Sequence, residues 1–398
     1  MRLDHVNRFV RAVASNVPLW LIAFPLAAQD TVRVRADGPA RWSNVRLVQE
    51  LSVGQVDGPP EYALGSIYLV APARDGSFYM FDGNDGQIRR YDSQGKYLRL
   101  IGRRGGGPGE YQTVGGMSTD VTGSLVVFDP GSQRVTHFSA EGKVVREWRT
   151  NLSSWNDFYV DSRERYYFRT SVVGGPQEGP GARFQYVRFS EDNRRLDSLL
   201  IPQLVPPAPA YRGFYTVTAD GGRNNFLVQN LAAVNLAGGA VFAASDAYRV
   251  FVNDGQRVRV LERTAQPVRL GSEEREQWLE WADTVRAGRT QLQYEIPRVK
   301  PFIRDLRTDH QGRIWVDVYV QAEKRTNLPP TRRNGGKMIL HWRERTTYDV
   351  FSPAGEYLGR VPLPADTRLL AIQGDRLYTI TRGADDEERM IVYRLLAS

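Results

Sequence analysis

Short runs of apolar, β-branched and aromatic residues alternate with turn residues along most of this chain. From residue 115 to residue 148 the pattern predicts a four-stranded antiparallel meander. An inner strand near 115–121 is followed by runs at 124–128, 134–138 and 144–148. Gly, Pro, Asp and Glu separate these runs, as expected for tight turns. A sheet this small cannot bury both of its apolar faces, so we expect it to stack against similar units.

The same pattern occurs twice at a fixed spacing. Gly76 corresponds to Gly123 and Asp82 to Asp129, in each case 47 residues apart. Further pairs with this spacing are Ile88 with Val135, Tyr91 with Phe138, and Gly95 and Lys96 with Gly142 and Lys143. A period of ~40–50 residues in a β-rich chain is typical of the blades of a β-propeller.

Weaker copies of the pattern follow, and each retains a tight turn that contains glycine. Blade three is expected at 158–160, 166–170, 186–189 and 196–201, blade four at 231–236, 240–244, 248–252 and 258–262, and blade five at 302–307, 313–320, 348–351 and 357–361. With a final blade near the end of the chain, the pattern predicts six blades.

The final blade has only three predicted strands, at 369–372, 376–381 and 390–395. A strand-like run at 41–53 precedes the first blade. Propellers commonly close by lending an N-terminal strand to the last blade, which removes open sheet edges. We therefore predict an all-β, six-bladed β-propeller of four-stranded antiparallel blades, in which residues 41–53 complete the last blade.

The second repeat resembles the NHL-type and TolB-like six-bladed propellers. Asp129, Arg134 and Val135 give the spacing D-x-x-x-x-R-V, and an aromatic residue and a Gly-Lys turn follow. The glycine-rich segment 102–111 is similar to the blade connector of bacterial members. The resemblance implies the fold and says little about activity, because propellers host many unrelated functions.

Asp129 and Arg134 flank one turn, and two interpretations of the pair are open. They form a ligand-binding pair, or Asp129 holds the turn beside a structural arginine. We favour the structural interpretation, because the aspartate recurs as Asp82 in the first repeat, where the arginine is replaced by Gln87.

The N-terminus predicts export. Arg2, Arg8 and Arg11 precede an apolar run at 17–28 that ends in small residues. This run is too short to cross a bilayer, which takes ~20 residues, and it is typical of a secretory signal peptide over residues 1–28. We expect residues 29–398 to form a single bacterial domain, periplasmic or secreted, without a transmembrane segment. The chain has no Cys, which excludes disulfide bonds and lipid attachment through cysteine.

The charge of the chain disfavours nucleic acid as a partner. Residues 1–28 hold three of the 53 Lys and Arg and one of the 45 Asp and Glu, so the mature chain carries an excess of only six positive charges. Nucleic-acid binders usually concentrate their positive charge on one face. An excess this small over a long chain favours an ordinary solvated surface.

Loop lengths divide the predicted ring into two faces. Turns between first and second strands, and between third and fourth strands, are short. The long segments 102–111, 171–183, 202–225, 265–301 and 321–347 all fall on the other face, where each inner strand begins. We call the first the tight-turn face and the second the long-loop face. Long loops in compact domains are often functional, so the long-loop face is the expected binding surface.

One long segment predicts a helix over about 272–288. Ser272 is a suitable N-cap, two glutamates follow, and Trp278 and Trp281 fall on one stripe. The two tryptophans either line a ligand pocket or fix the helix to the propeller. We favour packing, because paired aromatic residues on a helix usually serve the core.

The candidate partner-binding residues lie on the long-loop face, where basic residues form a possible rim for an acidic ligand. They are Arg103, Arg104, Trp155, Arg304, Arg332 and Arg333. The alternative interpretation of the basic segment 321–347 is a solvated loop. The preferred function is a non-enzymatic scaffold, without a cofactor, that binds a cell-envelope protein, a peptide or a glycan.

The alternative function is a metal-dependent hydrolase of lactones or esters. Gluconolactonase-like and paraoxonase-like propellers hold a divalent cation such as Ca²⁺ in the central channel with Glu, Asp and Asn. A resemblance to them implies Asn156, Asp157, Asn235 and Asp305 as metal ligands here. Blades one, two and six offer no such oxygen ligands at comparable places, and a complete cage of oxygen atoms does not emerge.

Overall fold

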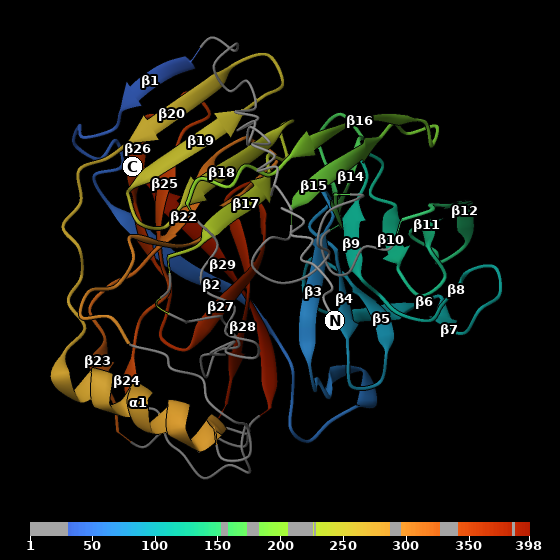
Figure 1. The fold of residues 1–398 in the computed structure, drawn as a ribbon. Coiled ribbons are helices and arrows are strands. Elements are labelled where there is room, and N and C mark those ends of the chain that lie inside the picture. Colours follow the sequence, from blue (N-terminus) through green and yellow to red (C-terminus); the bar gives the residue numbers. More distant parts are fainter. Residues whose placement is uncertain are drawn as a thin grey trace, which may run out of the picture.

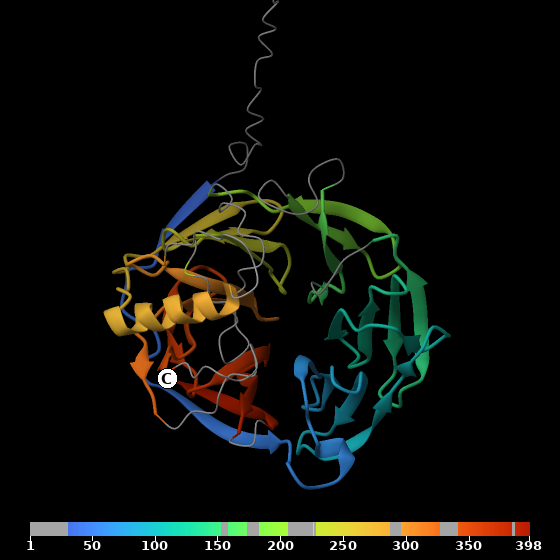
Figure 2. The same cartoon turned by 60° about the horizontal axis from the view of Figure 1, so that its bottom comes forward.

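The computed structural model describes residues 31–152, 158–172, 183–205, 226, 228–286, 296–326, 341–383 and 387–398, with side chains in the helix described up to residue 280. The described residues form a ring of six antiparallel blades around a central axis (Figures 1 and 2). The predicted signal peptide at 1–28 lies outside them, as do Trp155, Asn156, Asp157, Arg332 and Arg333.

Each blade contains four strands in chain order from the axis outward, except that the last blade takes its outermost strand from the N-terminus. Blade 1 is β3 (Ile67–Pro72), β4 (Phe78–Asp82), β5 (Gln87–Tyr91) and β6 (Tyr97–Ile101). Blade 2 is β9 (Gly116–Thr119), β10 (Leu125–Asp129), β11 (Arg134–Phe138) and β12 (Val144–Arg149). Blade 3 is β13 (Phe158–Val160), β14 (Tyr166–Ser171), β15 (Phe184–Phe189) and β16 (Arg195–Leu200).

The later blades follow the same plan. Blade 4 is β17 (Asn230–Val234), β18 (Ala240–Ala244), β19 (Arg249–Asn253) and β20 (Val258–Glu262), with β1 (Thr31–Arg35) added outside. Blade 5 is β21 (Ile303–Thr308), β22 (Ile314–Val318), β25 (Thr347–Phe351) and β26 (Tyr357–Pro362). Blade 6 is β27 (Thr367–Gln373), β28 (Arg376–Arg382), β29 (Glu388–Ala397) and β2 (Val45–Val53).

Among the described residues, a helix and four short strands lie outside the blade sheets on the long-loop face, and a 3-10 turn, η2 (Pro60–Tyr62), precedes blade 1. The helix α1 (Ser272–Arg286) confirms the predicted insertion, and the pairs β7 (Arg103–Arg104) with β8 (Glu110–Tyr111) and β23 (Glu323–Lys324) with β24 (Trp342–Arg343) form two-stranded sheets. In Figure 2 the long-loop face is turned toward the reader, and α1 lies across it.

The predicted closure of the ring is confirmed. β2 pairs antiparallel with β29, from Val45 opposite Ala397 to Val53 opposite Met390. The order within this sheet is β2-β29-β28-β27, so the N-terminal strand supplies the missing outer strand of the last blade. This pairing joins the two ends of the described chain and closes the ring.

β1 is a strand that the sequence analysis did not predict. It pairs in parallel with β20 over five positions, from Thr31 opposite Val258 to Arg35 opposite Glu262. The alternation of TVRVR is a weak signal for a strand. Its pairing with blade 4 depends on how far the chain travels around the outside of the ring, which no local pattern reveals.

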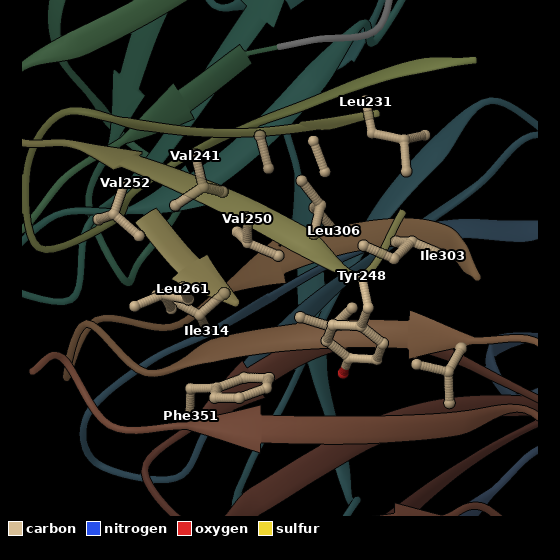
Figure 3. Close-up of a cluster of buried hydrophobic side chains, with 14 of the residues drawn as sticks. Leu231, Val241, Tyr248, Val250, Val252, Leu261, Ile303, Leu306, Ile314 and Phe351 are labelled. Carbon is tan, nitrogen blue, oxygen red and sulfur yellow. The ribbon is translucent and has the colours of Figure 1, made fainter. Parts of the chain in front are cut away.

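The core lies between blades rather than within them. Val241 and Val250 of blade 4 pack against Ile303, Leu306 and Ile314 of blade 5 in one buried cluster (Figure 3). Equivalent clusters join blade 1 to blade 2 and blade 5 to blade 6. Because each blade buries its faces only against its neighbours, stability depends on a closed ring.

The recurring aspartates hold the start of their own blades. Asp82 accepts backbone N–H groups of residues 65 and 66 at 2.9 and 3.0 Å. Asp129 accepts those of residues 112 and 113 at 2.8 and 3.2 Å. In both blades these donors precede the inner strand, and Asp129 is buried. The structural interpretation of the repeated aspartate is therefore confirmed.

Candidate functional site

The central channel holds a cavity with a volume of about 420 Å³. Its wall comes from the innermost strand of every blade, namely β3, β9, β13, β17, β21 and β27. Each of these strands is the end of its sheet and pairs with only one neighbour. The unpaired edge of each inner strand therefore turns backbone N–H and C=O groups toward the channel. The volume falls in the range of about 300–1,000 Å³ that is usual for small-ligand pockets.

Charged side chains in the described wall of the channel are mostly arginines. Arg169 of blade 3, Arg307 of blade 5 and Arg368 of blade 6 line the cavity, together with one carboxylate, Asp305. Burial lowers the pKa of His310, which lies in the turn after β21, against the smaller opposing effect of the neighbouring aspartate. His310 is therefore neutral near pH 7, and the guanidinium groups give the channel its positive charge.

The arginines of the inner strands also connect neighbouring blades. Nη1 of Arg307 donates to the carbonyl of Leu370 in blade 6 at 3.4 Å. Nη2 of Arg368 donates to the carbonyl of Ile67 in blade 1 at 2.8 Å. The same side chains therefore fix the spacing of blades 5, 6 and 1 and present positive charge to the channel.

A buried ion network fastens α1 to blade 5. Nζ of the fully buried Lys300 lies 2.7 Å from Glu274 of the helix and 3.0 Å from Glu344. It also donates to the carbonyl of Val320 at 3.0 Å. Burial raises the pKa of Glu274, although Lys300 opposes this shift. The network ties the helix, the start of β21 and the segment before β25 into one unit.

Apolar packing supports the same attachment. Trp278 is buried and meets the ring of Phe226 edge-on at a centroid distance of 5.7 Å. Gln277 exchanges two hydrogen bonds with the backbone of Trp342, at 3.1 and 2.8 Å. The interpretation of Trp278 as a packing residue is thus confirmed, whereas the side chain of Trp281 lies outside the described part of the helix.

The three described candidate binding residues come from separate parts of the ring. Arg103 and Arg104 are exposed on the connector between blades 1 and 2, and Arg103 pairs with Glu110 at 2.7 Å. Arg304 lies in blade 5 with its side chain only 10% exposed, and it is ion-paired with Glu344. Since Arg304 belongs to the internal network that holds α1, the structure gives it a structural partner instead of a place on the rim. Trp155, Arg332 and Arg333 lie outside the described residues.

The two described metal candidates are also separated. Asn235 closes the turn after β17 by accepting the N–H of Ala237 at 3.1 Å. Thr308 of β21 donates to the carbonyl of Val234 at 2.7 Å, which sets the relative height of the two strands. Asp305 lies three residues before Thr308, so it is about 10 Å along the axis from Asn235. No group of three or more His, Cys, Asp or Glu positioned for a metal occurs among the described residues.

The channel arginines were missed by the sequence analysis. Arg368 stands in a strand whose other residues are largely apolar, and this was an available signal, whereas β21 mixes Arg307 with Arg304 and Asp305 and gives none. A strand pattern does not show which strand is innermost or that three blades bring their arginines to one cavity.

Comparisons with known proteins support the fold. The family DUF5128, described as a 6-bladed beta-propeller, matches residues 59–202. No curated protein matches this chain. A member of the duf4221 family from Bacteroides vulgatus superposes with a TM-score of 0.50 at 12% identity, covering 90% of this chain and 99% of that one.

Two further solved structures are similar to a lesser degree. A Bacteroides fragilis protein inferred to be exported has a TM-score of 0.48 at 8% identity and covers 92% of this chain and 99% of its own. A gluconolactonase from Xanthomonas campestris has a TM-score of 0.42 at 12% identity and covers 90% and 92%. At these identities the likeness concerns the fold alone. The described residues contain no helix long and apolar enough to cross a membrane.

Proposed function

We propose that this protein is an exported bacterial scaffold, periplasmic or secreted, that binds a partner through its long-loop face and has no catalytic activity of its own. The partner classes are a cell-envelope protein, a peptide or a glycan. The observation that supports this proposal is the contrast between the faces. One carries a helix held by buried ion pairs, and the other carries short turns.

The tight-turn face is built for closure of the blades. Asp120, Asp161 and Asp309 each accept the N–H of the residue two positions later, at 2.9, 2.9 and 3.0 Å. These three carboxylates are therefore engaged in hydrogen bonds within their own turns. The Lys300 network on the opposite face fixes α1 as a rigid platform, and a rigid platform lowers the entropic cost of binding.

The hydrolase alternative has less support from the channel. A Ca²⁺ site takes six to eight oxygen ligands. The described wall offers one carboxylate, Asp305, among three arginines. Positive charge of this kind repels a divalent cation. Metal analysis of the purified protein, with esterase and lactonase assays before and after chelation, tests this alternative. Stoichiometric Ca²⁺ that is required for hydrolysis would overturn the scaffold proposal.

The binding proposal is tested by partner capture from envelope extracts at low salt, followed by hydrogen exchange on any complex. Arg103→Ala/Arg104→Ala removes two exposed charges from the long-loop face, and Arg332→Ala/Arg333→Ala tests the sequence candidates that lie outside the described residues. The matched control is Arg194→Ala/Arg257→Ala, which removes two exposed charges from tight turns.

We expect the long-loop variants to slow association with an acidic partner, because rim charges act chiefly on association rate, and the control to bind normally. Protection from exchange that is confined to the tight turns near residues 76, 95, 123 and 142 would contradict the proposal.

A further inference from the structure

Three arginines from three blades line one cavity. Arg169 of β14, Arg307 of β21 and Arg368 of β27 line the cavity of about 420 Å³ in the central channel. Asp305 is the single carboxylate in the described wall, so the side chains there carry a net charge of plus two. Like charges gathered in a small cavity repel one another, and an anion between them removes that cost.

Arg307 lines this space, and its side chain is partly exposed. Its buried Nε has no hydrogen-bond acceptor within the described part of the chain. The carboxylate of Asp305 lies 3.7 Å away, beyond hydrogen-bond distance, and the two side chains are 34% and 48% exposed. A guanidinium group presents five donors in a planar fork that fits the oxygen pairs of carboxylates and phosphates. An oxyanion in the channel would therefore gain a strong donor from Arg307.

The strand registers place the arginines at different depths. Arg368 is the second residue of β27, which begins at the long-loop face. Arg169 follows Phe168, and Phe168 pairs with Phe158, the first residue of β13. Both arginines therefore lie near the long-loop mouth. Arg307 is the fifth residue of the six in β21, and its Nη1 reaches Leu370 in the middle of β27.

We propose that the central channel is a binding site for a small organic oxyanion, a carboxylate or a phosphate ester, which enters from the long-loop face. Arg169 and Arg368 receive the anion at the mouth, and Arg307 binds it deeper in the channel. The unpaired edges of the inner strands supply backbone N–H donors around it. This site is independent of the partner-binding surface proposed above.

The test is calorimetric titration of the mature protein at low salt with citrate, with glucose 6-phosphate and with neutral glucose. Thermal unfolding with and without each ligand gives a second measurement, since a ligand that binds only the folded state raises Tm. The channel variants are Arg307→Gln, which removes the charge, and Arg307→Lys, which retains it without the planar fork. The matched control is Arg99→Gln, which removes one arginine from the outer strand of blade 1.

We expect saturable binding of at least one of the two anions, no binding of glucose, and a rise in Tm with the bound anion. Arg307→Gln should weaken binding at least tenfold, Arg307→Lys should weaken it less, and Arg99→Gln should leave it unchanged. Preference for citrate assigns a carboxylate site, and preference for glucose 6-phosphate assigns a phosphate site.

Two results would overturn the proposal. One is the absence of saturable binding by either anion at millimolar concentration in the unmodified protein. The other is equal anion binding by Arg307→Gln and by the unmodified protein, when circular dichroism shows that both proteins are folded. Neither result bears on partner capture at the long-loop face, so failure of the anion site and failure of the scaffold proposal are distinguishable.

Discussion

Among the described residues, the outer edges of the blades are covered by the N-terminal segment in one half of the ring and are open in the other half. In blades 4 to 6 the N-terminal segment runs along the outside, with β1 on β20 and β2 on β29. Between them Arg41 and Trp42 donate backbone hydrogen bonds to blade 5, at 3.2 and 2.7 Å. In blades 1 to 3 the outer strands β6, β12 and β16 have no further strand beside them in the described parts of the chain. In Figure 1 the dark blue strand β1 lies beside β20, on the opposite side of the ring from blades 1 and 2.

The difference shows two ways to stabilise a blade. Blades 1 and 2 use a device encoded within each repeat, the aspartate that holds the chain entering its own blade. The outer strands of blades 4 and 6 are covered by an N-terminal segment that is 227 to 352 residues distant in the sequence. The match to the six-bladed family covers residues 59–202, which contain blades 1 to 3.

The largest effect should come from removing the cover. A chain that begins at Gly58 lacks β1 and β2, and it loses the packing of Leu47, Leu51 and Val53 on blade 6 and its neighbour. Each buried apolar side chain contributes about 1.5–3 kcal/mol, so we expect Tm to fall by roughly 10 °C or more, with loss of solubility.

The matched control for this deletion begins at Asn44, which keeps β2 and removes β1 and the contacts of residues 41 and 42. Its Tm should fall by less. Normal thermal unfolding of the chain that begins at Gly58 would show that the N-terminal segment does not stabilise blades 4 to 6.

A smaller loss is expected from the local device in the open half. Asp129→Ala leaves the N–H groups of residues 112, 113, 131 and 132 without their shared acceptor. Hydrogen bonds to a charged group contribute about 1.5–3 kcal/mol, so we expect the free energy of unfolding to fall by about 2–4 kcal/mol. Urea denaturation measures this. Asp246→Ala, at an exposed aspartate in the turn after β18, is the control. Equal effects of the two changes would contradict the role of Asp129.

The two halves should also differ in the sign of their pH dependence. Burial alone would raise the pKa of Asp120 in blade 2, but hydrogen bonds from His137 and Thr122 outweigh it and hold that pKa below its ordinary value. Burial raises the pKa of Glu274 beside blade 5, against the opposing charge of Lys300. A lowered pKa stabilises the folded state above the ordinary value, and this stabilisation is lost as pH falls through the folded-state pKa.

The expected profiles follow from these signs. The stability advantage of the unmodified protein over Asp120→Asn should shrink as pH falls below about 4. The stability of the unmodified protein relative to Glu274→Gln should instead rise as pH falls from 7 toward 4. The reason is that the raised pKa of Glu274 favours the folded state once this carboxyl group is protonated. Urea midpoints between pH 3.5 and pH 7 measure both differences. Profiles of the same sign would show that one of the two environments is misassigned.

The smallest effect is expected at the open edge itself. Val145 of β12 is 65% exposed, so Val145→Lys should change the free energy of unfolding by no more than about 0.5 kcal/mol. Val34→Lys should cost more, because Val34 of β1 packs against the cluster between blades 4 and 5. Thermal unfolding of both variants makes the comparison. A large loss in Val145→Lys would indicate that something covers β12.

The sequence by itself determined the number of blades, most of their strands and the closure of the ring. Alternation, turn residues and a period of 47 residues are local signals, and β11, β13, β18 and β20 have the predicted bounds. The recurrence of Asp82 as Asp129 likewise indicated a structural aspartate, because both act within their own repeat.

Only the tertiary structure decided where β1 pairs, that Arg304 joins an internal network, and that Arg169, Arg307 and Arg368 face one channel. These features depend on which strand is innermost and which blades are neighbours across a closed ring. The pattern within a strand sets which residues share a face, but the partner of that face is fixed only when all six blades pack around the axis.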